Sequence, residues 1–408
     1  MTDVAALSLA AKSSGEPIYL DHAAATPLDP RVEAAMHAAA AFANPSSPHA
    51  AGRRARALLE DARERILTLV GGRTSGAIRD QLVFTSGATE ANRLGVLGTA
   101  GRHAGIVASS ARDHGSLVTA AARLVAAGWQ GVPLPLDTRG GACIAAGRLA
   151  ATSRGRVVVL CLTPLCGQTG IRDSLEPLAA ISPATTLLVH ADATQAIAWE
   201  SISFRDLPLT SLAFAPCKFG GPRGIGALVL RGDVPLEPLA DGPQERGLRG
   251  GTEPVALAVG FATALELAVA GRSEASRHVT LLRDAFERNV VAAAGRHGID
   301  SYVVGQGADR GPHITTIAFR GCDRQAMVMA ADLAGICLAT GTACASGSSE
   351  PSAAVAALGL PSWVPAAAVR ASFAASITSA EVDLAMVKLD GVFRGFVAGG
   401  LHRSIDTQ

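Results

Sequence analysis

The stretch SLAFAPCKFGGPRG (residues 211–224) predicts a buried strand that runs into a turn of glycine and proline, with Lys218 where the strand stops. The apolar run Ile225–Leu230 predicts the next strand. Apolar surroundings favour the neutral form of an amine, which can form a Schiff base with an aldehyde. A lysine at a strand end can equally reach solvent and have no chemical role. A second element upstream decides between these interpretations.

That element, LLVHADATQ (residues 187–195), predicts a strand ending in the carboxylate of Asp192, with the amide of Gln195 three residues later. Lys218 lies 26 residues after Asp192. Pyridoxal phosphate needs both groups, because an aspartate keeps its ring nitrogen protonated and a lysine carries its aldehyde. The pair therefore predicts a site for pyridoxal 5′-phosphate.

With this pair the chain resembles the class V aminotransferase family of pyridoxal-phosphate enzymes, and within it the cysteine desulfurases of the NifS/IscS kind. The resemblance runs from about Tyr19 to Asp383 and includes the entry segment IYLDHAAATPLDP (residues 18–30). It implies a homodimer that converts L-cysteine to L-alanine and passes the sulfur to an acceptor, such as an iron–sulfur scaffold protein. It also implies pyridoxal 5′-phosphate as the cofactor.

Composition limits the other possibilities. The chain has 408 residues, of which 49% are hydrophobic and 17% charged, so it can bury a large core. A net charge of +1 gives no reason to expect nucleic acid or a membrane surface as a partner. The 7 cysteines show no CxxC spacing, which argues against a disulfide framework or a zinc site. The first 17 residues make a poor signal peptide, and we expect a cytoplasmic protein.

Predicted strands such as Val157–Leu162 alternate with helical stretches such as Val255–Val269, which favours an α/β fold with a parallel sheet covered on both faces. The polar stretch NPSSPH (residues 44–49) predicts the cap of a further helix. With the resemblance, this predicts a fold type I pyridoxal-phosphate transferase: a large domain with a mainly parallel, seven-stranded type of sheet, and a smaller α+β domain. We expect an N-terminal segment over residues 1–28 that joins the small domain. The large domain should span 29–275, and the small C-terminal domain 276–408.

Two further strand ends supply candidate cofactor contacts. The strand Gln81–Thr85 leads into SGATEAN (residues 86–92), where small residues at a helix start let N–H groups approach an anion. Ala88 and the Thr89 hydroxyl would then bind the cofactor phosphate. His114 follows another strand, and the resemblance implies that it stacks on the pyridine ring as an acid/base. The residues alone favour a capping or surface histidine instead.

Three more roles follow from the resemblance. Thr252, in the loop GLRGGTEP (residues 247–254), would reach the cofactor phosphate of the neighbouring subunit. Arg370 would bind the α-carboxylate of the substrate, a role suited to a bidentate guanidinium. In the Gly/Ser-rich stretch GTACASGSSEPS (residues 341–352), Cys344 stands where related enzymes carry the persulfide.

The sequence departs from the family at three positions near the expected cofactor. Gly167 stands where relatives have an asparagine, Ala215 replaces a serine, and Cys217 replaces a histidine. The last two remove side-chain donors to the phosphate, each worth roughly 1.5–3 kcal/mol if nothing replaces it. We therefore expect the cofactor to bind, but with a weakened phosphate site.

These departures leave alternatives beside a cysteine desulfurase. One is a different pyridoxal-phosphate reaction, such as cleavage of selenocysteine or a cysteine derivative, which would not need Cys344. The other is a catalytically impaired paralogue that keeps the fold and acts as a binding partner. Such a protein would take up no cofactor.

Overall fold

The computed structural model describes residues 16–400, apart from 42, 102–103, 144–154, 176, 179–186, 241 and 342–349. Its largest element is a seven-stranded sheet in the spatial order β2-β8-β7-β6-β5-β3-β4. Only β8 runs antiparallel to its neighbours, so the predicted mainly parallel sheet is confirmed. The strands are β2 (Gln81–Thr85), β3 (Gly105–Ser109), β4 (Gln130–Pro133), β5 (Val157–Leu162), β6 (Leu187–Asp192), β7 (Ser211–Phe214) and β8 (Gly226–Leu230).

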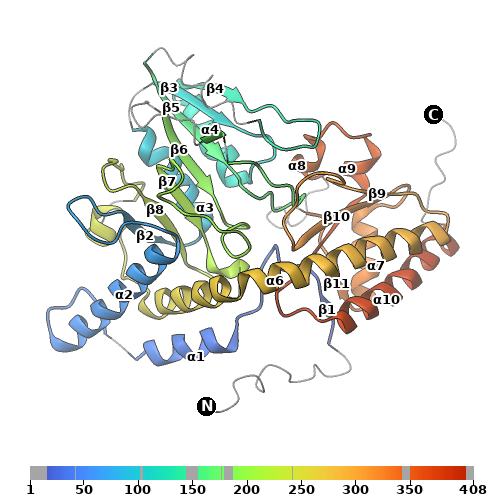
Figure 1. Ribbon diagram of the computed structural model, residues 1–408, viewed down its shortest axis with the longest axis horizontal. Helices are drawn as coiled ribbons and strands as arrows, with labels where there is room; N and C mark the ends of the chain where they lie inside the picture. Colours follow the sequence, from blue (N-terminus) through green and yellow to red (C-terminus); the bar gives the residue numbers. More distant parts are fainter. Residues whose placement is uncertain are drawn as a thin grey trace.

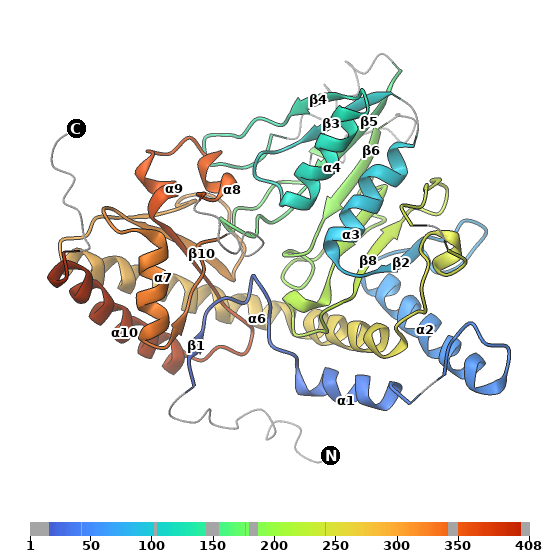
Figure 2. The same ribbon diagram turned by 180° about the vertical axis from the view of Figure 1, so that it is seen from behind.

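Helices cover both faces of this sheet, as Figures 1 and 2 show from opposite sides. The apolar sides of α2 (Ala50–Leu69) and α6 (Val255–Arg296) pack on one face in the main core cluster. On the other face lie α3 (Ala88–Arg93) and α4 (Gly115–Ala126), whose buried residues form two smaller clusters with the strands. A π-helical turn, η2 (Leu94–Gly98), continues α3.

The helix α6 links this sheet to a second layer of the structure, which is built on a separate, smaller sheet. It has 42 residues and packs against α1 (Pro30–Ala39), α2 and α10 (Ser379–Ala398). The predicted helix stopped at Val269, and the predicted domain boundary at 275 falls inside α6; that boundary stays a prediction. Among the described helices α6 alone is long and apolar enough to cross a membrane, a test that core helices of soluble proteins also pass.

The second layer is a three-stranded antiparallel sheet with helices around it, at the right of Figure 1. Its order is β12-β10-β9, and its core cluster also takes residues from α6, α7 and α10. The strands are β9 (Ser301–Val303), β10 (Ile314–Phe319) and β12 (Ala368–Ser372), and the helices between them are α7 (Arg324–Leu333), α8 (Ala353–Ala356) and α9 (Trp363–Ala367).

The N-terminal segment connects the two layers. Strand β1 (Ile18–Tyr19) pairs in parallel with β11 (Ile336–Cys337) beside the smaller sheet. The chain then crosses to the turn after β7, where Thr26 N donates to Cys217 O at 2.8 Å and Asp29 N to Gly220 O at 2.9 Å. The segment Asp21–Asp29 therefore lies across the turn that contains Lys218.

Candidate active site

The predicted site residues follow the carboxyl ends of strands that point to one edge of the large sheet. Asp192 ends β6, and Lys218 lies in the 3₁₀ turn η4 (Pro216–Lys218) just after β7. Thr89 is in the first turn of α3 after β2, and His114 follows β3. Ligands of open α/β sheets bind at this edge. The structure thus brings these residues to the place that the order of strands predicted.

Lys218 is held by the N-terminal segment. Its Nζ donates to Ala24 O at 2.5 Å, and the Thr26 hydroxyl donates to Lys218 O at 3.0 Å. A main-chain carbonyl and a side-chain hydroxyl of this segment therefore hold the two ends of the lysine residue. The hydrogen-bond partner of Nζ is thus a backbone carbonyl and not a carboxylate.

Asp192 is buried, with both carboxylate oxygens bonded. Oδ1 accepts from Thr194 N at 3.0 Å, and Oδ2 accepts from Asn92 Nδ2 at 2.7 Å. Asn92 is fully buried and is the fifth residue of α3. His190 lies two residues before Asp192 on the same face of β6, and it also contacts Asn92. The carboxylate therefore has a fixed direction at the end of its strand.

The start of α3 suits an anion. Its N-cap, Gly87, provides no side-chain cap, so the donors of the first turn at Ala88 and Thr89 are open to a phosphate. Glu90 accepts from Ser86 N at 2.6 Å and from Arg249 Nε at 2.8 Å. Burial would raise the pKa of Glu90, but these bonds hold it below its usual value. The chemistry of this donor set fits the phosphate of pyridoxal phosphate.

Gln195 takes the space that Gly167 leaves. A Cβ on Gly167 would lie 3.1 Å from Gln195 Cγ. The amide Nε2 donates to Ala23 O at 2.9 Å, and Oε1 lies 3.1 Å from His313 Nε2. His313 stacks on Trp199 with 4.5 Å between ring centroids, and burial holds its pKa well below the usual value. In this state Gln195 contacts the N-terminal segment, and its predicted cofactor contact stays a prediction.

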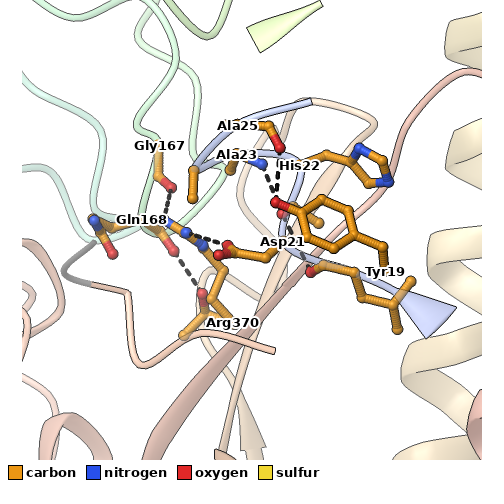
Figure 3. A network of polar contacts seen from close by, with 12 residues as sticks. Tyr19, Asp21, His22, Ala23, Ala25, Gly167, Gln168 and Arg370 are labelled. Carbon is orange, nitrogen blue, oxygen red and sulfur yellow. Dashed lines mark hydrogen bonds and ion pairs between the residues drawn. The ribbon is translucent and has the colours of Figure 1, made fainter. Parts of the chain in front are cut away.

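Arg370 lies in β12 with only 3% of its side chain exposed. Figure 3 shows its two contacts: Nη1 donates to Gly167 O at 3.0 Å and Nη2 to Asp21 Oδ1 at 2.8 Å. Its buried Nε has no partner among the described residues. A buried guanidinium with an unused N–H is suited to a ligand carboxylate. The position therefore agrees with the predicted role in binding the substrate.

The structure describes three of the remaining residues that were singled out in the sequence: Thr252, Ala215 and Cys217. Thr252 is exposed at the rim of a surface pocket of about 330 Å³, which Asn44 and the start of α6 also line. Cys217 is a half-buried free thiol beside Lys218, and Ala215 is buried. Cys344 lies outside the described residues, so its predicted role stays a prediction.

The sequence did not predict several residues whose side chains contact the predicted site residues or their partners. These are Asp21 beside Arg370, and Asn92, Ser116 and His190 around Asp192. One signal was available: asparagine is a poor residue for a helix interior, so Asn92 within α3 indicates a specific role for its side chain. The other contacts join distant parts of the chain and leave no local pattern.

Comparison with known proteins identifies the family of the chain. Residues 18–385 match the family described as Aminotransferase class-V. The chain is 35% identical over 376 residues to a cysteine desulfurase of Cereibacter sphaeroides, covering 90% of this chain and 93% of that one. It is 34% identical over 385 residues to an IscS-like cysteine desulfurase of Mycobacterium tuberculosis, covering 91% and 95%.

The fold has close relatives among solved structures. A NifS-like protein from Rickettsia africae superposes with a TM-score of 0.82 and 24% identity, covering 93% of this chain and 100% of that one. That likeness concerns the fold alone. The family match and the two sequence relatives together establish that the chain belongs to the class V aminotransferase family of pyridoxal-phosphate-dependent enzymes, in which the relatives it matches are cysteine desulfurases.

Proposed function

We propose that this protein is a cysteine desulfurase that converts L-cysteine to L-alanine and takes up the sulfur as a persulfide on Cys344. The observation that carries the proposal is the buried Arg370, whose Nε has no partner among the described residues and whose Nη2 donates to Asp21, in the same N-terminal segment that binds Lys218. A carboxylate-binding group and an amine thus both contact one short segment, as binding of an α-amino acid requires.

The residues have separate roles in this reaction. When bound, pyridoxal phosphate supplies an electrophilic aldehyde and a ring that withdraws electrons from the substrate carbon. Asp192 would hold the proton of the ring nitrogen, and the donors at Ala88 and Thr89 would hold the phosphate. Arg370 binds the α-carboxylate, while Lys218 Nζ takes and returns protons at the substrate carbons. The N-terminal segment lies over Lys218 and limits the access of water from that side.

The sulfur step balances without an added oxidant or reductant. The Cys344 thiolate attacks the sulfur of the substrate cysteine, so that an S–S bond forms and the substrate C–S bond breaks. The bonding pair of the broken bond stays with carbon, which is protonated to give the methyl group of alanine. The substrate is reduced to alanine, and the transferred sulfur becomes the outer atom of the Cys344 persulfide. A second thiol then removes it.

Several features extend the proposal beyond one chain. We propose a homodimer in which Thr252 completes the partner's phosphate site, since Thr252 is exposed beside a surface pocket. The names of its relatives do not identify the acceptor; a sulfur-acceptor protein, such as an iron–sulfur scaffold, is the partner we propose. We also propose a cytoplasmic protein, because the cysteine spacing shows no disulfide framework. The near-zero net charge gives no reason to propose nucleic acid or a membrane as a partner.

The test is incubation of purified protein with pyridoxal phosphate, L-cysteine and a reducing thiol. Alanine and sulfide should form in equal amounts. Alanine without sulfide, or turnover that survives Cys344→Ser, would indicate a different pyridoxal-phosphate reaction. A colourless protein that takes up no cofactor would instead support a paralogue that acts as a binding partner.

A further inference from the structure

A buried hydrogen-bond chain joins the two predicted ring contacts, Asp192 and His114. Asn92 Nδ2 donates to Asp192 Oδ2 at 2.7 Å and to Ser116 Oγ at 2.9 Å. Ser116 Oγ lies 2.7 Å from His114 Nδ1. Asn92 and Ser116 are buried, so solvent does not compete for these bonds. Residues from α3, β6 and the start of α4 therefore form one network.

The direction of each bond follows from its neighbours, beginning at the carboxylate. An ionised carboxylate only accepts hydrogen bonds, so the Asn92 amide must turn its NH₂ group toward Asp192. The second proton of that group then points at Ser116 Oγ, which accepts it. Reversing the amide would place its oxygen against the carboxylate and leave two buried acceptors facing one another.

The hydrogen bond at the Asn92 amide oxygen requires the same orientation of the amide group. Its Oδ1 lies 3.0 Å from His190 Nε2, and His190 Nδ1 lies 2.8 Å from Ser211 Oγ. Burial lowers the pKa of His190 to about 4, against an opposing effect of the nearby Asp192 charge, so the ring is neutral at pH 7. A proton on His190 Nε2 therefore meets Asn92 Oδ1, and the Ser211 hydroxyl donates to Nδ1.

At the other end, two donors meet His114 Nδ1. The backbone N–H of Ser116 lies 3.2 Å from Nδ1 and can only donate. The Ser116 hydroxyl, which accepts from Asn92, has its own proton available for the same nitrogen. Nδ1 is therefore an acceptor, and the proton of the neutral ring is on Nε2.

We infer that Asn92 and Ser116 orient the His114 ring so that Nδ1 accepts hydrogen bonds and Nε2 carries the ring proton, which leaves the proton transfers at the substrate to Lys218. The basic lone pair of such a ring is on Nδ1, where it already accepts two bonds. A proton on Nδ1 would face the backbone N–H of Ser116, so two donors would point at each other. His114 then contributes a polar N–H and a flat ring, which differs from the acid/base role that the resemblance implies. Asn92 and Ser116 are positioning residues.

The first test reads the tautomer directly, without turnover. Long-range ¹⁵N NMR on the full-length protein with pyridoxal phosphate bound, assigned with His114→Gln, should show a proton on Nε2 and none on Nδ1 of His114. Ser116→Ala removes the hydroxyl but keeps the backbone N–H at Nδ1, so it should raise the population of the Nδ1–H tautomer without making it the major form, and Ser116→Thr, which keeps the hydroxyl, should restore the original signal. Ser211→Ala removes a bond at the far end and should leave the His114 signal in place. A proton on Nδ1, or a signal unaffected by Ser116→Ala, would overturn the inference.

The second test separates a donor from a base by kinetics. The amide of His114→Gln retains an N–H donor but cannot exchange a proton, so kcat should fall by no more than about tenfold. Loss of a general base typically costs about 10²–10⁴-fold, and a fall of that size in His114→Gln would contradict the inference. The inference rests on the proposed function for its substrate. Absence of desulfurase activity in the parent enzyme would refute that function, whereas the tautomer would still be measured.

Discussion

Asp21 and Arg370 form an ion pair across 349 residues of sequence, with Asp21 Oδ1 2.8 Å from Arg370 Nη2. The arginine side chain is 3% exposed and the aspartate 21%, so the pair is shielded from water on the arginine side. The carboxylate of Asp21 therefore occupies one arm of the guanidinium that we expect to receive the substrate carboxylate. Substrate binding has to accommodate or displace it.

From this pair we predict opposite effects on stability and on ligand binding. Asp21→Asn should destabilise the protein by roughly 2 kcal/mol, because it leaves a buried guanidinium without its counter-charge. It should also tighten the binding of L-alanine and lower the KM for cysteine, because the competing carboxylate is gone. Urea unfolding and titration of the cofactor absorbance with L-alanine measure the two effects.

Asp29→Asn is the matched control for Asp21→Asn. Asp29 lies in the same segment but pairs with the exposed Arg31, whose side chain is 67% accessible. It should change neither measurement by much. A KM that rises in Asp21→Asn would show that Asp21 orients the guanidinium and does not compete for it.

Lys218 should be the residue that binds the cofactor covalently. Borohydride treatment of the purified, yellow protein should fix the cofactor to the peptide that contains Lys218. Lys218→Arg keeps a positive charge but should reduce turnover to background, because a guanidinium does not deprotonate at neutral pH. Mass spectrometry of the digested protein identifies the labelled peptide, and label on Lys388 would refute the assignment.

Cys344 should carry the transferred sulfur. Cys344→Ser should abolish sulfide release from cysteine and leave the cofactor absorbance intact, since the thiol is needed only after the cofactor has activated the substrate. Cys217→Ser is the control, because Cys217 lies beside Lys218 in a tight turn and its carbonyl is bound by Thr26 N. Persulfide mapped to Cys217 in the working enzyme would contradict this prediction.

The phosphate site should tighten when its missing donors are restored. Ala215→Ser combined with Cys217→His supplies two side-chain donors beside the turn of Lys218. One restored bond worth roughly 1.4 kcal/mol would tighten pyridoxal-phosphate binding about tenfold. Cofactor retained after dialysis, measured by absorbance, is the readout. Retention that is unchanged or lower would mean that the backbone at the start of α3 and after β7 has already compensated for both donors.

The buried Asp113 should make the free energy of unfolding depend on pH. Burial, the largest cause, raises the pKa of Asp113 to about 7 in the folded protein, well above its value of 3.8 when exposed. Its contribution to stability is therefore complete below about pH 4 and is lost as the pH rises through 7. Relative to the parent, Asp113→Asn should gain stability by a few kcal/mol between pH 4 and 8.

Urea unfolding at a series of pH values checks the Asp113 prediction. Asp300→Asn serves as the control, because the Asp300 side chain is 79% exposed and should show no such trend. A difference between Asp113→Asn and the parent that stays constant with pH would contradict the raised pKa of Asp113.

The sequence predicted the parts of the fold that depend on local pattern. The apolar run 157–162 is β5 with the same bounds, and the polar stretch before Ala50 caps α2 through His49. The predicted end of α6 at Val269 was wrong, because charged residues interrupt the apolar pattern there while the helix continues along the smaller sheet. Hydrophobic periodicity and residue propensity describe one segment at a time, so they do not show where a helix packs against a distant part of the chain.

The contacts inside the site depend on chain segments that meet only in the folded protein. Asn92 reaches Asp192 across 100 residues, and Asp21 reaches Arg370 across 349. Lys218 and Asp192 could be predicted because each ends its own strand, and strand ends of a parallel sheet gather at one edge. Arg370 carries no such signal, and its role followed from the resemblance alone.

The pairing of β1 with β11 also sets the order in which the site can be completed during synthesis. Ile18 leaves the ribosome early, yet its partner Ile336 is made 318 residues later. At 5–20 residues per second that interval lasts roughly 16–64 s. The large sheet and Lys218 are made before the segment Asp21–Asp29 has its anchor in β11. A nascent chain can therefore expose the lysine turn without its cover, and only a nearly finished chain can close over it.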